Sequence, residues 1–152
     1  SRKSRGLGDV YKRQAKYSKN FLWIRRDTEK GSVNFYISKI KNKENLNINH
    51  IRDSISKKFI PGPIEKTHMS TDKSYSPKSN EIQLTESLKV IETRGIWEVK
   101  NQFMAGPFIS HIVSNQKNSE ELYILEGFVY SPGTSKRDYI FELEAIFKSI
   151  KF

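Results

Sequence analysis

The sequence predicts an α+β domain: an antiparallel sheet of about five strands with two helices packed on one face, in the order β-β-α-β-β-β-α. Short segments rich in aromatic and β-branched residues are joined by short polar turns, which favours antiparallel pairing. Two other segments repeat apolar residues every three or four positions, as a helix with one buried side does. Each helix needs a surface to cover, and one sheet face is the simplest solution.

The first half of the chain predicts a strand pair and a helix. Residues 21–26 and 33–37 are the strands, and residues 30–32 form the turn of an antiparallel hairpin. Asn47 is a suitable N-cap for the first helix, and Pro61-Gly62-Pro63 ends it. The apolar stripe of this helix consists of Ile48, Ile51, Ile55 and Phe59.

The second half predicts a long loop, three strands and the second helix. Residues 64–80 are polar and form the loop, with one edge strand near residues 68–71. The strands are residues 87–99, preceded by a short stretch at 82–84, then 108–114 and 122–130, and residues 102–108 form a hairpin-like connection. Ser135 is the predicted cap of the last helix, and Asp138 lies near its positive end. The stripe of this helix is Ile140, Leu143, Ile146, Phe147 and Ile150.

Composition limits the classes of function. The chain has 152 residues, which suits one domain, and no cysteine, which excludes disulfides, thiolate metal sites and cysteine nucleophiles. The sequence has no run of about 18 apolar residues that would cross a bilayer. The formal charge of +10 invites a nucleic-acid or anionic-membrane interpretation.

The first 14 residues weaken that interpretation. The chain begins with Ser1, and residues 9–14 resemble the in-frame translation of a transposon end used in DNA library preparation. We therefore expect residues 1–14 to be an artefactual leader and residues 15–152 to be a single domain. Without the leader, five basic side chains and one acidic one are lost, and the charge is +6.

Four charged residues within the predicted strands and last helix are candidate ligand-binding groups: Glu92, Arg94, Glu126 and Glu144. Glu126 stands among large apolar residues, and Arg94 is predicted to meet it across the sheet as a bidentate pair. The favoured interpretation is an ion-pair network that supports the sheet. The alternative is a small polar pocket in which Arg94 fixes an anion and Glu126 or Glu144 acts as an acid or base.

The remaining motifs predict no catalytic residues, metal or cofactor. The three histidines, His50, His68 and His111, are far apart and lack the spacing of a zinc site. The glycines are scattered, without a phosphate-binding loop or a dinucleotide fingerprint. The lysines are spread along the chain and are not interleaved with aromatic residues, so a solvated surface explains them as well as nucleic-acid binding does.

Several segments, taken in order, carry a resemblance to a known family: residues 59–65, 94–97, 104–108, 126–132, Lys136-Arg137 and 143–146. Together they resemble one uncharacterised bacterial family, domain-of-unknown-function family 4837, whose members resemble anchored envelope lipoproteins. The resemblance implies a cell-envelope location, a lipid anchor on an N-terminal cysteine outside this sequence, and a chain that is the C-terminal part of a longer protein. It implies no activity. Where two glycines are expected, this chain has Ala105-Gly106.

These observations lead to three hypotheses, in order. The first is a non-catalytic binding or scaffold domain of an envelope lipoprotein, attached to the membrane only through that anchor, with an unknown partner. The second is a small-ligand-binding or enzymatic domain that uses Arg94, Glu126 and Glu144. The third is nucleic-acid binding through the basic surface, which salt-sensitive binding by residues 15–152 would reveal.

Overall fold

The computed structural model describes residues 13–42, 47–63, 66–100, 102–133 and 135–152, and the side chains of residues 13–17 are not described. Within these residues, an antiparallel sheet and two helices confirm the α+β class. The elements are β1 (Arg13–Ser18), β2 (Phe21–Asp27), β3 (Ser32–Lys41), α2 (Ile48–Phe59), β4 (Ser70–Thr71), β5 (Lys78–Gln83), β6 (Leu88–Val99), β7 (Met104–Asn115), β8 (Asn118–Tyr130) and α3 (Arg137–Ser149).

The described part of the chain forms a sheet of eight strands, so the expected number of about five was too low. Seven strands follow the order β1-β2-β3-β8-β7-β6-β4, and β5 pairs with another part of β6. β5 joins the end of the predicted loop to the short stretch expected at residues 82–84, and its polar, fully exposed sequence did not predict a separate strand. β1 begins at Arg13, so the last two residues of the expected leader lie in a strand; residues 1–12 lie outside the described part.

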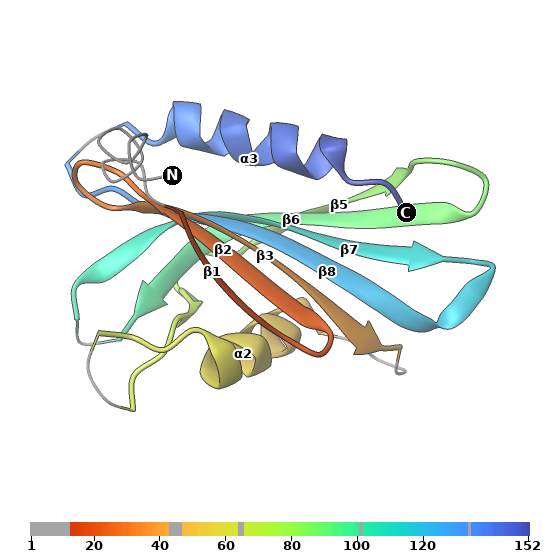
Figure 1. The fold of residues 1–152 in the computed structure, drawn as a ribbon, viewed down its shortest axis with the longest axis horizontal. Coiled ribbons are helices and arrows are strands. Elements are labelled where there is room, and N and C mark those ends of the chain that lie inside the picture. Colours follow the sequence, from red (N-terminus) through yellow and green to blue (C-terminus); the bar gives the residue numbers. More distant parts are fainter. Residues whose placement is uncertain (1–12, 43–46, 64–65, 101, 134) are drawn as a thin grey trace, which may run out of the picture.

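The two helices lie on opposite faces of the sheet, as Figure 1 shows, and the prediction that both cover one face was wrong. Successive strand residues point to opposite faces. Tyr36 of β3 therefore packs in the cluster that includes Ile55 of α2, while its neighbour Phe35 packs with Phe147 of α3. Leu125 belongs to the same cluster as Phe35. Because β3 and β8 are apolar on both faces, each face needs its own cover.

The two helices differ in how they begin. Asn47 caps α2 as predicted: its side-chain oxygen accepts from the backbone N–H groups of Asn49, at 2.9 Å, and His50, at 3.2 Å. The predicted cap of α3 was displaced by one residue, because Lys136 occupies the cap position. Among the described residues, neither helix has the length and apolar content needed to cross a bilayer.

Strand β7 starts earlier than predicted, because most of the expected connection at residues 102–108 belongs to it. Met104 already pairs with Val99 of β6. Gly106 and Pro107, which usually weaken a strand prediction, are tolerated because the β7–β8 ladder begins only at Phe108. The predicted edge strand near residues 68–71 is confirmed as β4, and this strand brings Thr71 next to Trp97 of β6.

Candidate functional site

A cleft of about 430 Å³ lies between the C-terminal half of α3 and the strands β6 and β7. α3 covers only part of this sheet face (Figure 1), and the cleft lies beside the helix. Its walls are mostly aliphatic and aromatic, and its volume falls in the range of small-molecule sites. The apolar wall residues are Leu84, Leu88, Val90, Ile109, Val113, Leu125, Phe147, Ile150 and Phe152.

A connected set of charged and polar side chains borders one side of the cleft, and we call it the Glu92 network: Glu92, Arg94, His111 and Glu144. Glu92, His111 and Glu144 line the cleft, and Arg94 joins them from outside it. Glu92 accepts from Arg94 Nε at 3.0 Å, and its other oxygen lies 2.8 Å from His111 Nε2. Arg94 Nη2 donates to Glu144 at 2.9 Å. β6, β7 and α3 thus each contribute to one network, which fixes the helix against the sheet.

The charges of the Glu92 network act on one another. Burial by itself raises the pKa of Glu92, but the hydrogen bonds from His111 and Arg94 outweigh it, so that pKa lies below its ordinary value. Burial likewise lowers the pKa of Arg94, and its bonds to Glu92 and Glu144 more than compensate, so that pKa is raised. Glu92 and Arg94 are therefore held in their ionised forms.

Three of the four predicted site residues meet in this network, but Glu126 does not. The predicted pair of Arg94 with Glu126 was wrong, because the two residues face opposite sides of the sheet. Arg94 is opposite Ile109 on β7, and Ile109 is in turn opposite Gly127, the neighbour of Glu126. Glu126 consequently points toward α2.

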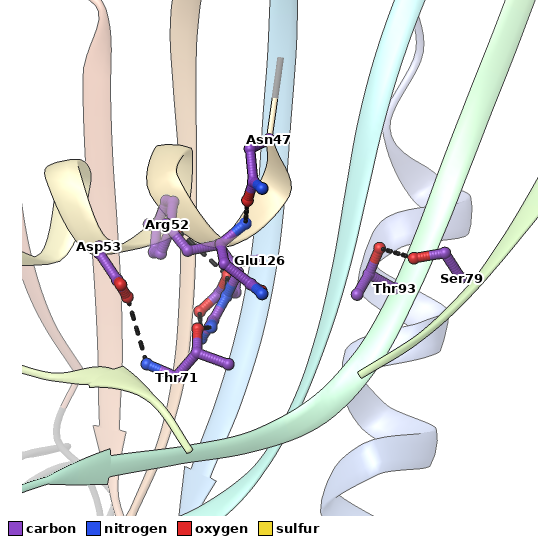
Figure 2. A network of polar contacts seen from close by, with 9 residues as sticks. Asn47, Arg52, Asp53, Thr71, Ser79, Thr93 and Glu126 are labelled. Carbon is purple, nitrogen blue, oxygen red and sulfur yellow. Dashed lines mark hydrogen bonds and ion pairs between the residues drawn. The ribbon is translucent and has the colours of Figure 1, made fainter. Parts of the chain in front are cut away.

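On that face Glu126 forms a buried ion pair with Arg52 of α2 (Figure 2). Arg52 Nε donates to Glu126 Oε1 at 2.5 Å and Nη2 donates to Oε2 at 2.9 Å, so the pair is bidentate. Both side chains are almost completely buried. Tyr36 Oη adds a third hydrogen bond to Glu126 at 3.2 Å, and Thr71 Oγ1 accepts from Arg52 Nη1.

The surroundings of the pair keep Arg52 charged and Tyr36 protonated. The guanidinium of Arg52 lies 3.4 Å from the ring centre of Phe108, a cation–π contact. Burial lowers the pKa of Arg52, but Glu126 outweighs this effect and the pKa is raised. Burial, together with the charge of Glu126, raises the pKa of Tyr36 well above its ordinary value, so its hydroxyl stays a donor.

Sequence reasoning missed Arg52 and His111. Arg52 stands four residues after Ile48 and three before Ile55, within the apolar stripe of α2, and that spacing could have marked it as buried. His111 was set aside for lacking a partner nearby in the sequence. Its partner Glu92 is its cross-strand neighbour, and only the register of β6 with β7 brings them together.

The charged groups beside the cleft already interact with one another. Glu92 and Arg94 form an ion pair with each other, and Glu144 forms another with Arg94. In the part of the chain that the structure describes, no group of three or more His, Asp and Glu side chains is placed to hold a metal. The cleft offers an apolar surface beside an ordered polar edge.

Fold and cleft together define a class: one antiparallel sheet with a helix on each face and a ligand-sized space beside one of them. The chain belongs to the family described as Domain of unknown function (DUF4837), whose model matches residues 9–149 and confirms the resemblance seen in the sequence. The comparison with curated proteins gives no match, and neither does the comparison with solved structures.

Proposed function

We propose that this chain is a non-catalytic binding domain and that the cleft beside α3 holds an amphipathic small molecule. The observation that carries the proposal is the combination of apolar walls with the Glu92 network at one side. An apolar ligand body would remove the wall residues from water, which is favourable in proportion to the area covered. The polar edge would fix its orientation.

The Glu92 network supports binding rather than turnover. A general base needs a pKa near the working pH, whereas the pKa of Glu92 is lowered and the group already accepts two hydrogen bonds. The second hypothesis, an enzyme that uses Arg94, Glu126 and Glu144 together, loses its main support because Glu126 lies sealed on the opposite face.

A neutral fluorescent probe tests the cleft. N-phenyl-1-naphthylamine carries no charge, so its emission should rise on binding to apolar walls and not to basic surfaces. Leu88, half-buried, lines the cleft, whereas Ile91 on the same strand does not. We expect Leu88→Trp to fill the cleft and reduce probe binding by about tenfold, and Ile91→Trp to bind like the wild type. Equal binding by all three proteins contradicts the proposal.

We further propose the cell envelope as the location, which the family resemblance implies. Fractionation of the full-length protein from its source cells is the test, with recovery expected in the membrane fraction. Recovery only with cytosolic markers contradicts this part of the proposal, and it leaves the cleft to be judged by the probe.

A further inference from the structure

A second pocket, separate from the cleft, lies beside α2 and the short strand β4 and has a volume of about 420 Å³. We propose that this pocket binds a phosphate-type group, a compact anion with more than one negative charge. The inference is independent of the function proposed for the cleft, because none of the residues that line one space lines the other.

The first argument is charge. Lys66, Lys73 and Lys100 line the pocket and come from three separate segments: the turn before β4, the turn after it, and the end of β6. None of the three is ion-paired with another described residue; the paired lysines there are Lys39 and Lys89. Three like charges around one space raise its positive potential, and an anion in that space relieves their repulsion.

Among the described residues that line the pocket, Asp53 is the only acidic one, and it already accepts a hydrogen bond. Its Oδ1 accepts from the backbone N–H of Thr71 at 3.2 Å. His68 also lines the pocket, and its Nδ1 lies 2.9 Å from the carbonyl oxygen of Met69, which leaves Nε2 as its second polar atom. The lining therefore carries a net positive charge with His68 neutral or protonated.

The second argument is a floor that is already ordered. Thr71 lies at the bottom of the pocket, and consecutive residues of α2 hold it: Arg52 donates to its hydroxyl and Asp53 accepts from its backbone N–H (Figure 2). Arg52 is itself fixed by Glu126. Because these side chains are already fixed before a ligand arrives, binding costs less free energy for ordering them.

The chemistry of the donors selects the ligand. Lysine ammonium groups act as point charges that suit phosphate, and the hydroxyls of Ser70 and Thr71 in the lining add neutral polar groups. The volume exceeds that of a single phosphate, so the group is expected within a larger molecule. Such a phosphate can be part of a soluble compound or of a lipid headgroup.

Pyrophosphate is the probe for the shared chemistry. In calorimetric titration of the full chain at low ionic strength, we expect saturable binding with one site. Lys73→Gln and Lys100→Gln should each weaken the affinity by about tenfold, the effect of losing one charge-assisted hydrogen bond. The control is Lys117→Gln, an exposed lysine that lines neither space and changes the net charge equally.

Vesicles distinguish the two sources. Phe103 is fully exposed three positions after Lys100, where it can enter a lipid surface. Binding to phosphatidylcholine vesicles that contain phosphatidic acid, lost in Phe103→Ser while pyrophosphate binding remains, indicates a lipid headgroup. Pyrophosphate binding without vesicle binding indicates a soluble compound. Binding of neither probe, or an equal loss in Lys117→Gln, overturns the proposal.

Discussion

At the scale of single residues, the pair of Arg52 and Glu126 is the most demanding feature of the molecule. Both ions have lost their water, and each is compensated almost entirely by the other and by Tyr36 and Thr71. Such pairs contribute little net stability compared with apolar residues of similar size, but removing one partner leaves an unpaired charge in the core. The pair acts mainly on the placement of α2, since it ties that helix to a central strand.

Removing one partner should therefore cost more than removing both. We expect Glu126→Leu to lower the free energy of unfolding by about 3–5 kcal/mol, because Arg52 is left charged and buried. The double variant Arg52→Met with Glu126→Leu should recover most of the loss. Urea denaturation followed by circular dichroism measures the free energy of unfolding of both variants. The control is Glu86→Leu at an exposed position, whose free energy of unfolding should lie within about 0.5 kcal/mol of the wild-type value. A single variant as stable as the wild type contradicts this account.

Glu92 gives the fold a dependence on pH. Its pKa is lowered by folding, so the folded state keeps the carboxylate ionised at pH values where the unfolded chain takes up a proton. The stabilisation is complete above the ordinary value of 4.5 and is lost as the pH falls through the lower folded pKa. In Glu92→Gln, the fall in stability across this acid range should be shallower than in the wild type. Denaturant midpoints measured at a series of pH values test this, and Glu86→Gln should reproduce the wild-type slope.

At the scale of elements, the docking of α3 depends on a glycine in the strand beneath it. A Cβ atom added at Gly127 of β8 would stand 2.6 Å from Leu143 Cδ2, too close for any real contact. Leu143 is fully buried beneath α3, so its side chain or the helix must shift to accept that atom. Gly127 thus lets the helix approach the sheet closely enough to bring Glu144 to Arg94 at the edge of the cleft.

The contact between Gly127 and Leu143 predicts that Gly127→Ala destabilises the wild type but stabilises the Leu143→Ala variant. Gly127→Ala should destabilise the wild type by about 1–3 kcal/mol through overpacking. Leu143→Ala should cost about 2–5 kcal/mol through the cavity that it leaves. In the Leu143→Ala background, however, the methyl group of Gly127→Ala occupies part of that cavity and should restore stability. A double-mutant cycle by thermal unfolding measures the coupling, and simple additivity would contradict the contact.

At the scale of the whole molecule, the sequence predicted the helices and central strands better than their arrangement. Helical spacing identified α2 and α3 because each buries one side, and Asn47 marked the start of α2 chemically. β5 was predicted only as a short stretch at residues 82–84, because most of its residues are polar and exposed and show no apolar alternation. Spacing within an element says nothing about which face of the sheet the element covers.

The prediction of the site was partly right and partly wrong for the same reason: the sequence does not show which face of the sheet a residue occupies. Glu92, Arg94 and Glu144 were selected for their charge on apolar segments, and the structure brings them together. Glu126 was selected by the same criterion, but its partner comes from a helix 74 positions earlier in the chain. Pairing across a sheet depends on register and on the faces of both strands, and neither can be obtained from composition or local periodicity.

The neighbours Glu126 and Gly127 show how strictly one strand is constrained. The first receives Arg52 from one helix, and the second makes room for Leu143 of the other, on opposite sides of the same peptide bond. If β8 slipped by one position, a carboxylate would be forced against leucine and an arginine would be left above a bare backbone. A shifted register of β8 is thus unfavourable on both faces of the sheet. Both helices can pack only when β8 pairs in its native register.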